Sequence, residues 1–171
     1  MQTADVLLMT YDNMLGSLDG WLAKAQEHPR GDALLDERLA LDMLPLARQV
    51  RFACNLPGEA VAGVAGVAFG SSDQDDATLA AARKRIATTR ELVRGWRDVR
   101  FDEDGAPIAL ALANGMTFDL DTAAYARDWA LPQFYFHLVT AYAILRAAGV
   151  PLGKADYVGY MFRYLRQPPP A

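Results

Sequence analysis

The strongest constraint on the fold is the spacing of apolar residues, which recur at intervals of three and four along several long stretches. Residues 3–28 carry one such stripe, and residues 77–97 carry another in which Thr89 is the only polar member. A stripe with this period lies on one face of an α-helix and is buried against neighbouring helices. The pattern predicts helices over 3–28, 43–67, 77–97 and 131–149, packed as an all-α four-helix bundle.

Several residues within or next to these stretches predict local departures from regular helix. Pro57-Gly58 lies in the middle of the second stretch, where proline removes a backbone donor, and predicts a kink or break. Asp75 or Asp76 is expected to cap the third helix, because a side-chain oxygen there can accept from free backbone amides. The fourth stretch is apolar nearly all round, which predicts burial on most sides.

A small β-hairpin is predicted between the third and fourth helices. Asn114-Gly115 separates two short β-prone runs, Ile108–Leu112 and Met116–Leu120, and an Asn-Gly pair favours a tight hairpin turn. A two-stranded hairpin is marginal alone, so it is expected to lie against the bundle. One or two helical turns are expected over 122–128, and residues 150–166 are expected to form a turn and a short helix covering one end.

Length and charge limit the domain organisation and the partners. A chain of 171 residues fits one domain, here 1–166, followed by a flexible Pro-rich tail at 167–171. The net charge of −4 argues against nucleic acid or an anionic membrane surface as partner. One cysteine, Cys54, excludes an intrachain disulfide, and Asp5 and Asp12 interrupt the only apolar stretch near the N-terminus. These features predict a cytoplasmic protein.

His137 is the one histidine in a predicted helix core, and it allows two interpretations. It could act as a metal ligand or general base, or it could be a neutral imidazole hydrogen-bonded to a polar group on a facing helix. Asp42 and Gln49 are seven residues apart, so both could point toward His137 and Thr89 and form a polar pocket. Alternatively, Asp42 caps the second helix and Gln49 is solvated at its edge.

No metal and no cofactor are predicted for this pocket. A metal site in a helical bundle needs several ligands one helical turn apart, converging on one cation. One turn beyond His137 stands Ala141, while Thr140 is a poor ligand and His28 lies at the far end of the first helix.

Several motifs together resemble an uncharacterised bacterial domain-of-unknown-function family of the DinB/YfiT-like four-helix-bundle superfamily. They are Pro132-Gln133-Phe134-Tyr135-Phe136-His137, Ala141-Tyr142 and Gly153-Lys154-Ala155-Asp156-Tyr157, with LALDMLPLARQV and RKRIATTREL upstream. The resemblance implies the bundle and a pocket at the position where metalloenzyme relatives carry three histidines. Only His137 has a counterpart among those histidines, since the second position of the usual pair is Ala141. The resemblance therefore implies a degenerate metal site.

Three functional hypotheses follow. The first is a protein that binds a small molecule in the polar pocket around His137. The second is a transferase or hydrolase with His137 as general base and Asp42 or Gln49 orienting the substrate. The third is a stress-related interaction protein whose bundle forms a homodimer and has no catalytic activity.

Overall fold

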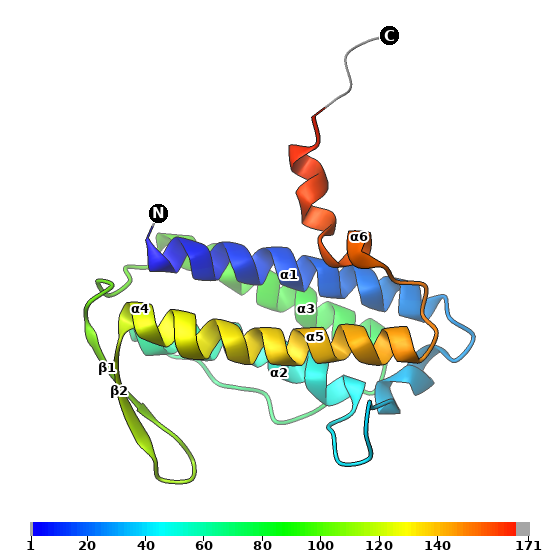
Figure 1. Ribbon diagram of the computed structural model, residues 1–171, viewed down its shortest axis with the longest axis horizontal. Coiled ribbons are helices and arrows are strands. Elements are labelled where there is room, and N and C mark those ends of the chain that lie inside the picture. The colour runs from blue at the N-terminus through cyan, green and yellow to red at the C-terminus, as the bar shows by residue number, and fades with distance from the viewer. Residues whose placement is uncertain (1, 167–171) are drawn as a thin grey trace.

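The computed structural model describes residues 2–166, and its body is a bundle of four long helices. These are α1 (Thr3–Gln26), α2 (Leu46–Ala65), α3 (Leu79–Gly95) and α5 (Leu131–Ala147). α1 packs mainly on α3 and α2 on α5, while contacts of α2 with α3 and of α1 with α5 close the bundle. α1 and α5 run in one direction and α2 and α3 in the other (Figure 1). The predicted four-helix bundle is confirmed; the predicted tail lies outside the described residues.

The predicted apolar stripes meet along the axis of the bundle. Leu15 and Leu22 of α1 and Ile86 of α3 are fully buried. The ring of Tyr11 lies edge-on to that of Phe134, with centroids 4.8 Å apart. Burying each such side chain contributes ~1.5–3 kcal/mol, so these contacts hold the four helices together.

Helix α2 departs from prediction at its start and at its middle. Pro45 occupies the N-cap position, and Asp42 lies in an exposed turn before it, so the predicted cap is wrong. The helix is also unbroken at Pro57-Gly58. A Cβ atom on Gly58 would lie 2.2 Å from the Phe69 ring, so glycine lets the returning segment 66–78 pack directly on the backbone of α2.

The acids before α3 form ion pairs instead of capping the helix. The hydroxyl of Thr78 accepts from the amide of Ala81 and serves as the cap. Asp75 pairs with Arg48 and Arg51 of α2, and Asp76 pairs with Arg85. The expectation that Asp75 or Asp76 caps this helix is therefore wrong, because the nearby arginines take the carboxylates.

The predicted hairpin is present as β1 (Pro107–Ala111) and β2 (Thr117–Asp121), antiparallel, with Ala111 opposite Thr117. Gly115 in the turn has φ of 86°, a conformation that glycine adopts without strain. Ile108, Leu110 and Leu120 contact the core, and the tip projects sideways from one end of the bundle, below α2 in the view of Figure 1. The hairpin packs against the bundle through these three side chains.

The hairpin joins the last long helix without a loop. α4 (Thr122–Ala124) follows β2 directly and continues through a π-helical segment, η3 (Tyr125–Ala130), into α5. The Asp121 carboxylate accepts from the Ala124 amide at 2.6 Å, and Thr122 donates twice to the Ala106 carbonyl. The helical run therefore starts at Thr122, nine residues before the predicted start at Leu131. Pro132 lies within this run and does not end it.

The fourth predicted helix ends at a glycine and has one exposed face. Gly149 has φ of 93° and terminates α5, and the Val150 amide donates to the Leu145 carbonyl as in a Schellman motif. Phe136 and Val139 are exposed on one side of α5, while the other sides are buried or half-buried, as the expected burial on most sides requires. One face of this helix is open to solvent.

Four short helical segments flank the long helices and the hairpin within residues 2–166, apart from the run that leads into α5. η1 (Gly31–Asp36) and η2 (Trp96–Asp98) are 3-10 turns after α1 and α3. α6 (Lys154–Tyr157) packs on α1, but η4 (Gly159–Tyr164) points away from the bundle instead of covering its end (Figure 1). Within residues 2–166, no helix combines the length and the apolar character that crossing a membrane requires.

Candidate functional site

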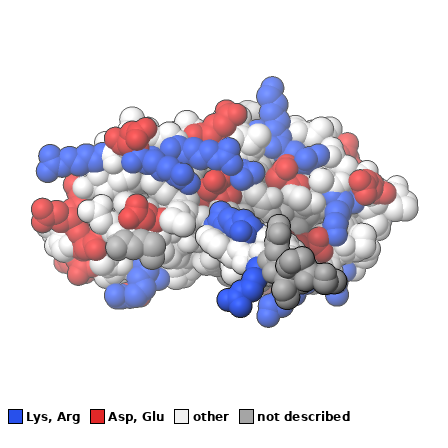
Figure 2. Space-filling model, turned by 90° about the horizontal axis from the view of Figure 1, so that it is seen from above, with Lys and Arg blue, Asp and Glu red and all other residues white. Residues whose placement is uncertain are grey.

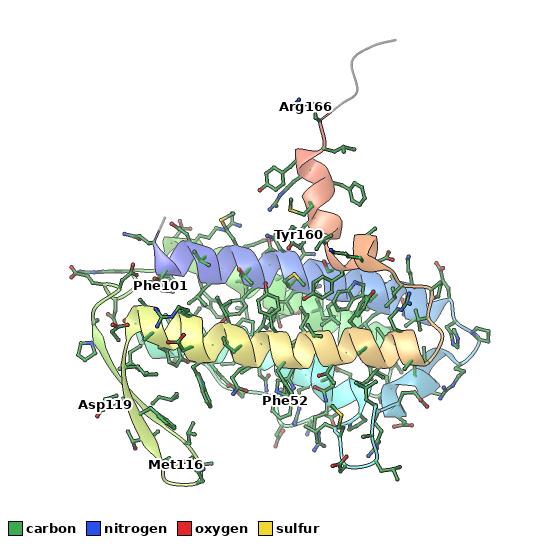
Figure 3. The ribbon with its side chains drawn as sticks, viewed as in Figure 1. Phe52, Phe101, Met116, Asp119, Tyr160 and Arg166 are labelled. Atoms are coloured by element: carbon green, nitrogen blue, oxygen red, sulfur yellow. The ribbon has the colours of Figure 1, made fainter. Side chains whose placement is uncertain are left out.

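His137 lies on α5 where that helix packs against α2, with its ring between two aromatic side chains. The imidazole stacks on Phe52 of α2, with centroids 4.7 Å apart and planes 24° apart, and Phe136 lies edge-on at 5.2 Å. Phe52 projects from the side of the bundle that α2 and α5 share (Figure 3). The ring is half-buried, so one edge can meet a molecule from solvent.

Gln49 fixes the hydrogen-bonding state of the imidazole. Its amide Nε2 donates to the Leu44 carbonyl at 3.1 Å, so its Oε1 is the atom that faces His137. Oε1 lies 2.8 Å from Nδ1 of His137 and can only accept, so Nδ1 carries the proton. The neutral ring then presents an unprotonated Nε2, which has no hydrogen-bond partner within residues 2–166.

Burial keeps this imidazole neutral. It lowers the pKa of His137 below its usual value of 6.5, because the protonated ring would lose hydration in this environment. At neutral pH the site therefore offers a lone pair on Nε2 and no positive charge. Such a group accepts a proton from a hydrogen-bond donor or acts as a general base.

The structure brings together two of the four predicted site residues. Gln49 is only 1% exposed and contacts His137, as one of the two interpretations required. Asp42 is exposed in the turn before α2. Thr89 donates to the Arg85 carbonyl and lines a separate cavity of about 460 Å³ beside Cys54, whose lining does not include His137.

One aromatic neighbour of His137 and one ion pair were missed in the sequence. Phe52 follows Gln49 by three residues, a spacing that places both on one face of a helix, and this signal could have identified it. Arg51 lies over the Phe52 ring at 5.0 Å and pairs with Asp75 at 3.0 Å. The segment that follows α2 thus helps to hold Phe52 against the imidazole.

The residues around His137 do not fit a metal ion. Nδ1 is engaged with the Gln49 amide, and Ala141 follows one helical turn later with a methyl group. Within residues 2–166, no three His, Cys, Asp or Glu side chains are grouped so that they could share a cation. A metal held by Nε2 alone would lack the three protein ligands that catalytic sites use.

Comparisons with known proteins agree with this architecture. A family model described as a domain of unknown function, DUF1993, matches residues 4–158. The chain is also similar to the crystal structure of a DinB family member protein from Shewanella denitrificans, with 32% identity and a TM-score of 0.77. That alignment covers 96% of this chain and 95% of the other. A comparison with curated proteins finds no match. The resemblance to a DinB-like family of unknown function is confirmed.

Proposed function

Since the chain belongs to the DUF1993 family of DinB-like proteins, we propose that it binds a small molecule at His137 without a metal ion. The observation that carries this proposal is the hydrogen bond from Nδ1 of His137 to Gln49, which leaves Nε2 of the half-buried ring as an acceptor. Burying the amide of a glutamine costs free energy unless its polar atoms are hydrogen-bonded, and the bond to the imidazole meets this requirement for Oε1.

The surroundings define the chemistry of the ligand. Nε2 accepts a hydrogen bond, so the ligand presents an N–H or O–H group to it. The rings of Phe52 and Phe136 flank the imidazole and favour a planar, apolar portion beside that donor. The absence of charge on the imidazole at neutral pH gives no preference for an anion there.

A second candidate is proton abstraction by His137, favoured by its neutral state. An imidazole with a lowered pKa and a fixed tautomer is suited to take a proton from a substrate hydroxyl, thiol or amine. Gln49 then orients the base, while Asp42, in its exposed turn, makes no hydrogen bond to the imidazole.

The test uses nitrogen-15 NMR of the histidine ring together with two probes, phenol and benzamide. Wild-type protein is expected to show the Nδ1–H tautomer at neutral pH and a shift of Nε2 on titration with a probe. His137→Phe, which keeps an aromatic ring, should abolish probe binding, whereas Val139→Ser on the exposed face of α5 should not. An Nε2–H tautomer, or probe binding unchanged in His137→Phe, would contradict the proposal.

Native mass spectrometry of freshly purified, untagged protein gives an independent readout. A co-purified organic molecule that is absent from His137→Phe would support the site. Near-stoichiometric metal in the wild-type protein, lost in His137→Phe, would overturn the metal-free interpretation.

A further inference from the structure

A cavity of about 740 Å³, called the α1 cavity below, lies over the middle of α1 between α3 and the segment formed by α6 and η4. Its lining contains no residue of α2 or α5, so it is separate from the site around His137. Small-molecule sites usually measure about 300–1,000 Å³. The α1 cavity is therefore of the right size for a small molecule of its own.

Two glycines one helical turn apart form the floor of the α1 cavity. A Cβ atom on Gly20 would have no neighbour within 4 Å, so the space above it is open. A Cβ atom on Gly16 would lie 3.1 Å from the guanidinium carbon of Arg90, so this guanidinium group lies directly on the backbone of α1. The side chains of the cavity therefore stand around its floor and do not fill it.

Basic side chains outnumber acidic ones in the lining of the α1 cavity. The basic residues are Lys24, Arg90, Arg94 and Arg163, and the acidic residues are Asp12 and Asp156. The cavity thus carries two more positive than negative charges, although the whole chain has a net charge of −4. Figure 2 looks onto this side of the molecule and shows a row of basic side chains across it. A local excess of this sign attracts anions.

The hydrogen bonds within the cavity leave guanidinium donors available. Arg90 and Arg94 share one carboxylate, that of Asp12, to which their Nε atoms donate at 2.9 and 3.2 Å. The two terminal nitrogens of Arg90 have no hydrogen-bond partner within residues 2–166. Arg163 lies over the Tyr164 ring at 4.8 Å, and no carboxylate of the described residues pairs with it. Guanidinium groups bind phosphate oxygens through such free N–H donors.

Aromatic side chains form the wall on the side of η4. Phe162 is 63% exposed, and Tyr160 is half-buried at the base of η4 (Figure 3). This wall is fixed to α1, because the indole of Trp21 donates to the Asp156 carbonyl at 3.0 Å. An aromatic surface beside guanidinium groups favours a ligand in which a flat apolar group is attached to the anion.

We propose that the α1 cavity binds a small organic phosphate, a phosphate monoester that carries a flat apolar group. The phosphate accepts hydrogen bonds from Arg90 and Arg94, and Arg163 balances its second charge. The apolar group lies over Gly20 and against Phe162. A phosphate monoester carries a charge of about −1.5 to −2 at pH 7, which matches the charge excess of the cavity. This site is additional to the one around His137 and does not depend on it.

The first test is calorimetric titration of the full chain with phenyl phosphate at about pH 8, where the probe is a dianion. The dianion has no N–H or O–H group to donate to Nε2 of His137. We expect saturable binding of one molecule per chain. Benzenesulfonate has the same ring and one charge less, and inorganic phosphate has no ring, so each should bind at least ~10-fold more weakly. No saturable binding of phenyl phosphate, or equal binding of either comparison compound, would overturn the proposal.

Two substitutions, each with a matched control, locate the probe. Arg90→Gln should weaken binding at least ~10-fold, because it removes charged donors to the phosphate. Arg83→Gln should not, because Arg83 lies seven residues earlier on α3, outside the cavity, and pairs with Asp19. Gly20→Leu should abolish binding by filling the floor, whereas Gly95→Leu, at an equally open position outside the cavity, should not.

The fold of the Gly20→Leu variant is checked by its melting temperature. Leucine favours helix more than glycine does, and the Cβ atom meets no neighbour there, so the melting temperature should be unchanged or higher. Binding that survives Arg90→Gln or Gly20→Leu, or that is lost in either control, would place the probe outside the α1 cavity and refute the assignment.

Amide NMR distinguishes this site from the one around His137. Phenyl phosphate should shift the amide signals of Gly16, Gly20 and Phe162 and leave that of Gln49 unchanged. These shifts should persist in His137→Phe, because the two sites share no residue. Shifts centred on Gln49, or their loss in His137→Phe, would rule out the α1 cavity as the binding site. Failure of phenol to bind at His137, with these shifts intact, would contradict only the function proposed for His137.

Discussion

Replacing His137 by phenylalanine is expected to lower the free energy of unfolding by ~1–3 kcal/mol, the cost of leaving a buried acceptor unpaired. The acceptor is Oε1 of Gln49, a side chain that is 1% exposed and faces Nδ1 at 2.8 Å. Phenylalanine keeps an aromatic ring against Phe52, so the loss isolates the hydrogen bond from the stacking contact. His137→Ala would add the lost ring contact and is less informative.

A double-mutant cycle measures this hydrogen bond, with Gln49→Leu as the second substitution. Leucine removes the amide and supplies an apolar side chain of similar size. In that background the Gln49 acceptor is already gone, so His137→Phe should then cost close to nothing. The predicted coupling is ~1–2 kcal/mol, well above the ~0.5 kcal/mol scatter of independent sites. Gln49→Leu alone should cost less than His137→Phe, because the Leu44 carbonyl that it releases belongs to a partly exposed residue.

The assay is urea denaturation followed by circular dichroism at about pH 8, where a histidine with a normal pKa is neutral in both states. Equal m-values across the four proteins would show that the comparison is between similar native and denatured states. Additive effects would refute the reasoning, since they would mean that Gln49 does not bond the imidazole. The fixed tautomer, on which the proposed ligand site rests, would then be lost.

Three further predictions test other parts of the structure. Folding lowers the pKa of His137, so the unfolded chain binds more protons than the folded chain as pH falls through about 6.5. The melting temperature of the wild type should therefore drop there relative to that of His137→Phe, and parallel profiles of melting temperature against pH would contradict this. Helix propensity alone favours Gly58→Ala, but the clash with Phe69 should reverse the sign and cost ~1–3 kcal/mol in urea melts, with Phe69→Ala restoring part of it. Asp75→Ala should cost ~3–5 kcal/mol by leaving the buried Arg51 charge unpaired, and a loss under ~1 kcal/mol would show that water reaches it.

The long helices were predictable from sequence because each buries a continuous stripe. The stripe of α1 alone, with Leu15 and Leu22 fully buried, nearly defines its length. The hairpin was also predictable, within one residue at each strand, from Asn114-Gly115. These features depend on local periodicity and on turn chemistry, which a single chain displays directly.

Other features depend on what a distant segment places beside a residue. Asp75 reads as a cap in sequence, yet it forms ion pairs because α2 presents Arg48 and Arg51 opposite it. Pro57-Gly58 predicts a kink or a break, yet the helix is unbroken there and the glycine receives the Phe69 ring. Local spacing carries no information about either neighbour.

The candidate site was half predictable for the same reason. His137 was expected in a helix core and Gln49 beside the apolar stripe of the second helix, so their meeting could be expected once α2 and α5 were paired. Thr89 shares the seam of α3, but α3 approaches the other side of α2, where Cys54 lies. Which side of a helix meets which neighbour is a property of the whole bundle.

The direct junction between the hairpin and the helix of His137 has a mechanical consequence. β2 passes into α4, η3 and α5 with no flexible spacer, and Thr122 ties the start of this run back to the Ala106 carbonyl (Figure 1). A hairpin joined in this way cannot swing on a hinge of its own at that end. A force applied to its exposed tip is transmitted along one stiff rod, as rotation or translation, to the imidazole two turns inside α5.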